Sequence, residues 1–199
     1  AVSQGRPQLQ IYDIAGGETR RIPLRELGEI YNPTWSPDGK QIAFSAIEGG
    51  ITDLFVVNVE NGQVRRLTND AFADLQPAWS PDGSRIAFVT DRFTSNTSDL
   101  YFGQYRLALL NPGTGEIEPV SGFETGKHIN PQWARDGRTL YFVSDRDGVS
   151  NIYRVSLADR RVTQITNTQT GVSGITHLSP AFSVAANDER LVYSSFAGG

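Results

Sequence analysis

The 199-residue sequence contains no cysteine and no methionine. Without cysteine there is no disulfide framework, no thiolate metal site and no cysteine nucleophile. This absence leaves the redox compartment open, because a chain without thiols is compatible with any of them. Without methionine there is no initiator residue, so we expect a processed chain, an excised segment or a redesigned one.

Basic residues are also few, and lysine supplies only a small part of the 18 lysine and arginine residues. A net charge of −4 and an isoelectric point near 5.2 argue against general nucleic-acid binding, which needs a basic face. No apolar run approaches the ~18–20 residues of a membrane helix, so we expect no membrane insertion. Phosphate-binding glycine loops, dinucleotide fingerprints and zinc-protease motifs are missing, and we expect no cofactor.

What the sequence does contain is an internal repeat. Residues 32–44, 76–88 and 130–142 share Asn/Gln-Pro-x-Trp, an Asp-Gly turn and an Ile/Leu-x-Phe segment, and a weaker copy spans 179–193. Their anchoring aromatic residues are separated by 44, 54 and 49 positions; they are Trp35, Trp79, Trp133 and Phe182. Blades of WD40-type propellers repeat every ~40–45 residues, so these spacings indicate a propeller with insertions.

Each period has the pattern of four short strands. The stretch before the tryptophan is the first strand, and the Asp-Gly turn leads into the second. Two further runs of β-branched and aromatic residues, separated by a hairpin turn, are the third and fourth. The sequence therefore predicts an all-β chain, with one propeller domain over 1–199 and blades near 30–68, 74–120 and 128–166.

The repeat resembles a known family. Trp-Ser-Pro-Asp-Gly at 35–39 and 79–83, the strand that begins at Asp53, and Arg-Arg-Leu-Thr at 65–68 are similar to the WD40-like repeat of TolB-type propellers. The resemblance implies a β-propeller in a periplasmic or otherwise extracytoplasmic setting that binds a protein or a small ligand. Similar repeats occur in the gating propellers of prolyl-oligopeptidase-like enzymes and in large bacterial proteins of unknown role, and a fold alone does not determine function.

The two ends of the chain look like halves of one blade. Residues 8–22 match the third and fourth strands, and residues 177–196 supply the first and second. If these halves pair, the ring closes as a four-bladed propeller with one composite blade and no free strand edge. The alternative is an open segment of a larger propeller, whose free edges allow self-association with another copy.

One repeat position collects polar residues. Asp74, His128 and His177 each lie three residues before a proline, and Ile30 has this place in the first repeat. In a propeller such positions surround the mouth of the central tunnel. Two imidazoles and a carboxylate suit a divalent transition metal or an anionic ligand. The alternative is a structural slot that caps the start of the innermost strand.

Several other features have both a structural and a functional interpretation. The segment with Asp145, Asp147 and Asn151 resembles the start of a calcium loop, but it lacks the distant glutamate, and a hairpin turn also explains it. The repeated tryptophans can stack on a ligand, although their period favours packing between adjacent blades. We expect the repeated Asp-Gly pairs to be turns and not catalytic acids.

Enzymatic motifs are not matched. The serine-hydrolase elbow Gly-x-Ser-x-Gly fails at Ser173, where the fifth position is Ile175. The sequence therefore favours a non-catalytic propeller module that binds a protein partner or a small ligand at the tunnel mouth. Two alternatives stay open. One is a substrate-gating segment of a peptidase whose catalytic domain is absent, and the other is an excised or engineered repeat fragment with no independent function.

Overall fold

The computed structural model describes residues 2–3, 6–176, 180–185 and 190–196. Regular structure in these residues is almost entirely β-strand, and the one helical element among them is the short 3-10 turn η1 (Thr97–Asp99). None of the helical structure in these ranges is long and apolar enough to cross a bilayer. The all-β prediction is confirmed.

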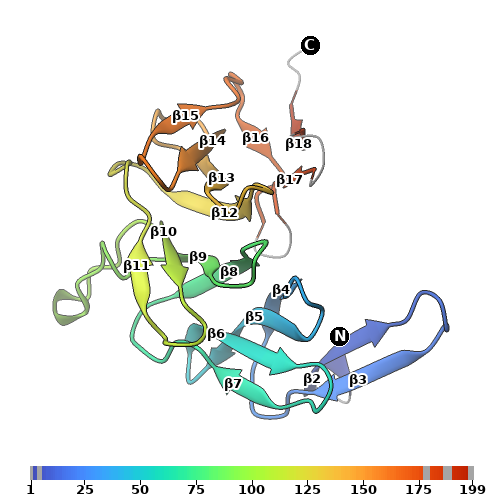
Figure 1. Cartoon of the computed structure of the whole chain (residues 1–199). Helices are drawn as coiled ribbons and strands as arrows, with labels where there is room; N and C mark the ends of the chain where they lie inside the picture. The colour runs from blue at the N-terminus through green and yellow to red at the C-terminus, as the bar shows by residue number, and fades with distance from the viewer. Residues whose placement is uncertain (1, 4–5, 177–179, 186–189, 197–199) are drawn as a thin grey trace.

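Three four-stranded antiparallel sheets match the three complete repeats (Figure 1). The first contains β4 (Ile30–Trp35), β5 (Gln41–Glu48), β6 (Ile51–Asn58) and β7 (Val64–Arg66). The second contains β8 (Asp74–Trp79), β9 (Ile86–Thr90), β10 (Arg106–Leu110) and β11 (Ile117–Pro119). The third contains β12 (His128–Trp133), β13 (Thr139–Ser144), β14 (Asn151–Ser156) and β15 (Val162–Gln164). Strand order follows the sequence in each, which is the order of propeller blades.

The repeated turn between the first two strands has a clear physical basis. Gly39 has a positive φ of 69°, a backbone conformation that glycine adopts without steric cost. Asp38 accepts hydrogen bonds from the Ser36 hydroxyl at 2.6 Å and from the backbone N–H of Lys40 at 3.0 Å. The same serine-to-aspartate bond holds Asp82 in the second repeat, at 2.6 Å. The side chains of these two aspartates therefore stabilise turns, as expected.

The two ends of the chain form separate three-stranded sheets. One contains β1 (Val2–Ser3), β2 (Arg6–Tyr12) and β3 (Thr19–Pro23), and the other β16 (Val172–Ser173), β18 (Leu191–Ser195) and β17 (Phe182–Val184). Residues 177–179, the start of the expected C-terminal half-blade, lie outside the described residues.

The sequence left two arrangements of these half-blades open, a composite blade that closes the ring and an open segment, and the described strands form the open one. Within the described strands, none of the N-terminal sheet pairs with any of the C-terminal sheet. The strand edges that would meet are partly occupied, β2 by β1 at residues 6–7 and β18 by β16 at residues 194–195. The five sheets form an open arc in Figure 1, with β4, β8, β12 and β17 on its inner side.

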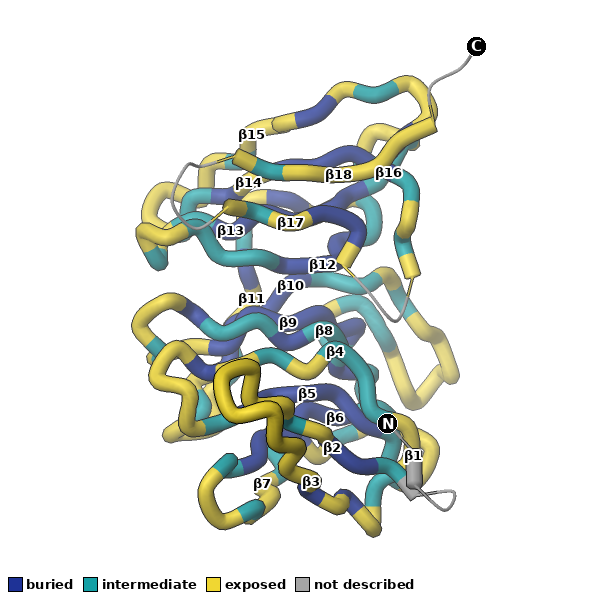
Figure 2. The backbone as a smooth tube through the Cα atoms, turned by 90° about the vertical axis from the view of Figure 1, so that its right-hand side faces the viewer, coloured by how far each residue is buried: buried dark blue, intermediate teal, exposed yellow. Residues whose placement is uncertain are grey.

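The hydrophobic core lies between consecutive sheets and not within any one of them. One cluster joins the N-terminal sheet to the first complete sheet through Leu9, Ile22, Phe44 and Phe55. A second joins the first and second complete sheets, and the third and largest joins the second complete sheet through the third to the C-terminal sheet. Figure 2 shows this as buried strand centres with exposed connecting loops. Each sheet thus depends on a neighbour to bury its faces.

Candidate functional site

The inner strands line a cavity of about 300 Å³ at the centre of the arc. Its wall consists of prolines, amide side chains, Thr34 and Ala78; the prolines and amides are Asn32, Pro33, Gln76, Pro77, Asn130, Pro131, Gln132 and Pro180. None of these lining side chains carries an ionisable group. A wall of amides and prolines can bind a peptide by shape and hydrogen bonding, but it offers no general acid or base.

The amides owe their position to an unusual backbone. Asn32, Gln76 and Asn130 have φ values of 50°, 52° and 55°, in the left-handed region that residues other than glycine enter uncommonly. Each immediately precedes a proline, and a β-bulge interrupts the pairing of the inner strand at each position. Bulges redirect side chains, and here they recur in every complete repeat. Sequence reasoning saw the Asn/Gln-Pro pairs as repeat markers and missed this role.

Two of these amides connect neighbouring sheets. The Gln76 side-chain oxygen accepts a 2.8 Å hydrogen bond from the backbone N–H of Asn130. The Asn130 side-chain oxygen accepts in turn from the backbone N–H of Ala181 at 2.9 Å. Gln132 adds a further link, because its side-chain oxygen accepts from the backbone N–H of Val184 at 3.0 Å. The inner ends of the blades are therefore joined by side-chain-to-backbone bonds.

The predicted tunnel-mouth residue Asp74 is fully buried at the start of β8. Both of its carboxylate oxygens accept hydrogen bonds from the Arg92 guanidinium, at 3.0 and 2.7 Å. Burial raises the pKa of Asp74 to about 6, and the positive charge of Arg92 offsets only part of that effect. Its carboxylate is thus already ion-paired within the protein.

The second predicted residue, His128, is fully buried at the start of β12. Its ring makes edge contacts with Phe123 and Phe142, with centroids 4.3 and 5.6 Å away. Neither ring nitrogen has a hydrogen-bond partner among the described residues. Burial lowers the pKa of His128 to about 3, and the nearby charge of Arg106 adds to the effect. The imidazole is neutral at ordinary pH.

These two residues therefore have different surroundings, one facing an arginine and the other aromatic rings. The third predicted residue, His177, lies outside the described residues. Ile30, at the same repeat position, packs against the core cluster between the N-terminal sheet and the first complete sheet. Ligand binding by this set stays a prediction.

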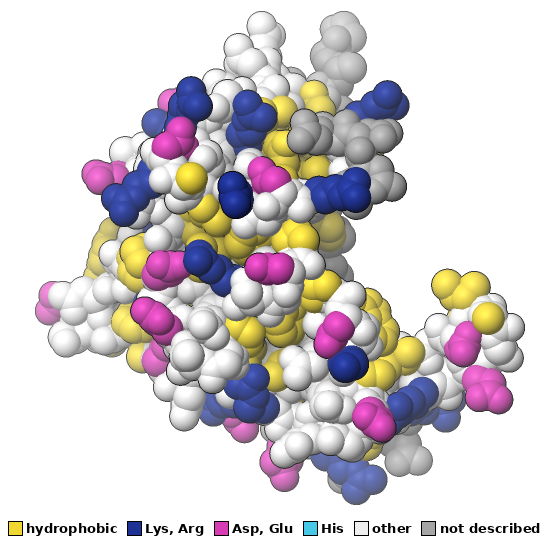
Figure 3. All heavy atoms as spheres, viewed as in Figure 1, with side chains coloured by type: hydrophobic (Ala, Val, Ile, Leu, Met, Phe, Trp, Pro, Cys, Tyr) yellow, Lys and Arg dark blue, Asp and Glu magenta, His cyan; other side chains and the backbone are white. Residues whose placement is uncertain are grey.

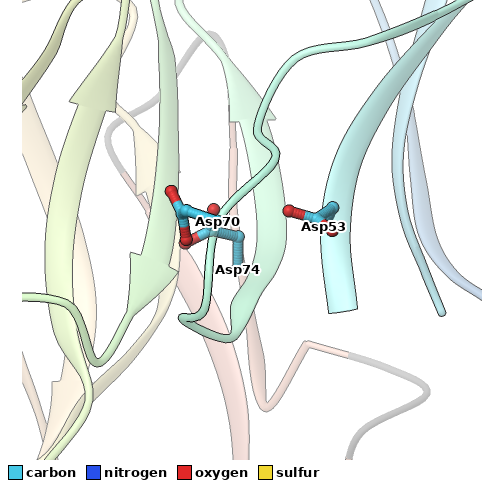
Figure 4. A group of neighbouring side chains, drawn as sticks. All are labelled: Asp53, Asp70 and Asp74. Atoms are coloured by element: carbon cyan, nitrogen blue, oxygen red, sulfur yellow. The ribbon is translucent and has the colours of Figure 1, made fainter. Parts of the chain in front are cut away.

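A carboxylate cluster that sequence reasoning missed lies at the seam between the first and second complete sheets (Figure 4). Asp53, Asp70 and Asp74 have carboxylate oxygens within 4.8 Å of one another. Two arginines balance part of their charge: Arg66 pairs with Asp53 and with Glu48, and Arg92 pairs with Asp74 and also with Asp70 at 3.1 Å. Each arginine pairs on its own side of the seam, Arg66 within the first complete sheet and Arg92 with Asp74 of the second and Asp70 of the connecting segment.

The Asp53 contacts explain one motif of the repeat. The Thr68 hydroxyl donates to Asp53 at 3.1 Å and accepts from the backbone N–H of Leu54 at 3.0 Å. The third complete sheet repeats this arrangement with neutral residues, since the Thr166 hydroxyl donates to Asn151 at 2.9 Å. The Asp-Leu and Leu-Thr segments therefore anchor the third strand to the end of the fourth.

The predicted calcium residues each have a partner inside the protein. Asp145 accepts a 2.6 Å hydrogen bond from the backbone N–H of Lys127, and Asp147 accepts one of 2.8 Å from the Tyr153 hydroxyl. Asn151 is held by Thr166, as described above, and by the backbone N–H and hydroxyl of Thr168, at 2.9 and 3.1 Å. A calcium site here stays a prediction. The Ser173 hydroxyl donates to the Ser194 hydroxyl at 3.0 Å.

Comparison with known proteins gives the same fold. Residues 1–108 match the model of the TolB beta propeller domain. The crystal structure of TolB from Acinetobacter baumannii covers 96% of this chain and 44% of its own, with a TM-score of 0.74 and 21% identity. A puromycin-hydrolyzing peptidase of Mycobacterium tuberculosis covers 92% of this chain and 31% of its own, with a TM-score of 0.67 and 19% identity.

Sequence relatives point to the same group. The Tol-Pal system protein TolB of Bordetella pertussis is 31% identical over 150 residues, which are 75% of this chain and 32% of that protein. Dipeptidyl-peptidase 5 of Porphyromonas gingivalis is 27% identical over 175 residues, 79% of this chain and 24% of that protein. The chain thus spans a third or less of these relatives. Because the family model covers more than half of the sequence and the repeat is shared, the chain belongs to the TolB β-propeller family.

Proposed function

We propose that this chain is a non-catalytic binding module whose inner strands bind a segment of a protein partner. We also propose that it works in an extracytoplasmic setting. The observation that supports the proposal is the chemistry of the central cavity, whose wall of amides and prolines carries no ionisable group. A proline-rich wall is apolar and stiff, while the amides supply hydrogen bonds that orient an extended peptide. The relatives named TolB are Tol-Pal system proteins, so Pal of the same organism is the partner to test.

A cavity-filling variant tests this proposal. Thr34→Trp would occupy the cavity, whereas Thr19→Trp places the same side chain on the exposed face of β3. We expect Thr34→Trp to weaken binding of fluorescently labelled Pal at least tenfold and Thr19→Trp to leave it unchanged. The proposal fails if the wild-type chain does not bind Pal, or if Thr34→Trp binds as tightly as the wild type.

The second candidate function is a substrate-gating propeller segment of a peptidase. It is favoured by the 27% identity with dipeptidyl-peptidase 5 over 79% of the chain. In that role the arc would restrict access to a catalytic domain by size. The coding sequence on either side of this segment decides between the two: an adjoining α/β-hydrolase domain with its Gly-x-Ser-x-Gly elbow supports gating.

Small-ligand binding at the predicted tunnel mouth has its own test. Titration with Zn²⁺ would compare the wild type with His128→Ala and His177→Ala. Binding that is lost in both variants supports a site formed by Asp74 and the two histidines. Equal heats of Zn²⁺ binding in the wild type and both variants would contradict this proposal.

A further inference from the structure

One loop interrupts the regularity of the repeat. The second and third strands of the first complete sheet are joined by Gly49 and Gly50 alone, whereas the corresponding connection in the second sheet spans residues 91–105. This loop projects from the sheets on the left of Figure 1. Long loops that leave a regular scaffold are typical sites of molecular recognition.

The loop is held in one conformation by its own hydrogen bonds. Asn96 and Tyr101 exchange both backbone bonds, at 2.8 and 2.9 Å. The Ser95 hydroxyl donates to Asp91 at 2.7 Å and accepts from the backbone N–H of Gly103 at 2.9 Å. The loop is therefore a built hairpin with its backbone bonded internally, not an extended tether.

The close approach of the two arms of this hairpin requires glycine at position 103. A side chain there would lie 2.4 Å from the backbone oxygen of Thr94, which is too close for any real Cβ atom. The Thr94 hydroxyl also donates to the backbone oxygen of Gln104 at 2.6 Å. The two arms of the hairpin thus approach each other directly, which fixes the position of the tip.

Three consecutive apolar residues occupy that tip. Leu100, Tyr101 and Phe102 are 78%, 60% and 70% exposed. Leu100 also has a positive φ of 53°, which costs a residue with a Cβ atom about 1–2 kcal/mol. The hairpin therefore holds a branched apolar side chain in water and in a strained conformation. Exposed apolar residues on a rigid support are characteristic of interaction hot spots.

The charges of the loop indicate the class of partner. Between Phe93 and Tyr105 the one charged residue is Asp99, and there is no lysine or arginine. Binding to anionic lipid surfaces relies on basic residues, so this composition disfavours a membrane. Hydroxyl and amide side chains flank the apolar tip, at Thr97, Ser98 and Asn96. An apolar centre with a polar, nearly uncharged rim is the composition of a protein–protein interface.

We propose that the tip formed by Leu100, Tyr101 and Phe102 is a knob that inserts into an apolar pocket of a protein partner, with a basic residue of that partner facing Asp99. The inference rests on the proposed binding function and adds to it a contact surface distinct from the central cavity.

Photo-crosslinking in the cells that make this protein provides the test. A photoreactive phenylalanine analogue would replace Tyr101 and, as a control, Thr114 on the exposed hairpin between β10 and β11. We expect a discrete protein adduct from position 101 and none from position 114. The adduct protein would then be identified by mass spectrometry and purified.

Binding measurements with that purified protein complete the test. The variant Leu100→Ser/Phe102→Ser should bind at least tenfold more weakly than the wild type, with an unchanged midpoint of unfolding. The matched control is Ile14→Ser, because Ile14 is also a strongly exposed apolar residue, 92% exposed on another hairpin, and its loss should leave affinity unchanged.

Four results would overturn the proposal: no adduct at position 101, an adduct with a second copy of this chain, an adduct with a phospholipid, or equal affinity of the serine variant. Thr34→Trp separates this proposal from the cavity proposal. If Thr34→Trp abolishes partner binding and the serine variant does not, the cavity function stands and the knob fails. The opposite pattern supports the knob alone.

Discussion

The side-chain oxygen of Gln76 accepts a hydrogen bond from the backbone N–H of Asn130, 54 positions further along the chain. The left-handed backbone at Gln76 directs its amide toward the next sheet, and the same backbone at Asn130 directs a second amide toward Ala181. A backbone conformation that costs free energy locally thus positions each of these amides to bond to the next sheet.

Replacing Gln76 by alanine should therefore destabilise the protein. The backbone N–H of Asn130 would lose its acceptor, which for a buried group costs about 1–3 kcal/mol. Asn32→Ala is the matched control, because Asn32 has the same backbone conformation before a proline and no side-chain hydrogen bond in the described structure. Urea denaturation of both variants measures the difference. Equal losses would show that backbone conformation, and not the bond, determines the cost.

The Asp53–Arg66 pair should be replaceable by the neutral pair of another blade. In the third complete sheet Asn151 stands for Asp53, and Gln164 donates to Thr166 at 2.8 Å as Arg66 donates to Thr68 at 2.9 Å. Arg66→Gln alone leaves Asp53 buried without its cation, and we expect the lower part of the about 3–5 kcal/mol measured for broken buried pairs, since Arg66 is partly exposed.

The double variant Asp53→Asn/Arg66→Gln should recover most of that loss. It removes the unpaired charge and also one of three crowded carboxylates. Thermal and urea unfolding of the single and double variants give the coupling between the two sites. A double variant as unstable as Arg66→Gln alone would mean that the blades do not share this arrangement.

His128→Ile should stabilise the protein. The wild-type imidazole is buried with two ring nitrogens that have no partner among the described residues, and an isoleucine already occupies this repeat position at Ile30. Removing buried polar atoms that lack hydrogen bonds should raise the free energy of unfolding by about 1–2 kcal/mol. His128→Asn, which keeps polar atoms at the site, serves as the control. A loss of stability in the isoleucine variant would point to a ligand or water bound by the imidazole.

The two residues at this repeat position should respond to pH in opposite directions. Asp74 has a native pKa of about 6 against 3.8 for the free group, so between these values the native state holds a proton that the unfolded chain has released. Its contribution to stability falls as the pH rises from about 4 to 6. His128 has a native pKa of about 3 against 6.5, so the unfolded chain takes up the proton first and stability falls as the pH decreases below 6.5.

Unfolding free energies measured between pH 4 and 7 separate these effects. Relative to wild type, Asp74→Asn should become more stable as the pH rises, and His128→Ile should become more stable as the pH falls. Parallel curves for a variant and the wild type would show that the residue does not change its protonation on unfolding.

Much of the fold could be predicted from the sequence, because blade strands pair with their immediate neighbours in the chain. The strand before Trp35 and the turn after it depend on local signals alone, and so do their counterparts at Trp79 and Trp133. Packing of these tryptophans was predictable only where a complete sheet precedes them. Trp133 donates to the backbone oxygen of Ala78 on the preceding inner strand at 2.9 Å, whereas Trp35 is 49% exposed because the N-terminal sheet lacks an inner strand.

The candidate site was less predictable, because its features depend on contacts between repeats. No local sequence pattern shows that Arg92 pairs with both Asp70 and Asp74, or that Phe123, which lies in a loop, packs against His128. The choice between a composite blade and an open segment could not be made from the sequence for the same reason. Pairing of distant strands depends on the curvature summed over all blades, which no local pattern encodes.

The placement of the core between sheets has a consequence for how the molecule opens. Because every cluster joins adjacent sheets, a terminal sheet is stabilised from one side and an interior sheet from two. In a nearest-neighbour description of a repeat protein, opening then proceeds inward from the ends of the arc. Amide hydrogen exchange should accordingly be fastest in β3 and β18 and slowest in β9, with protection graded along the arc.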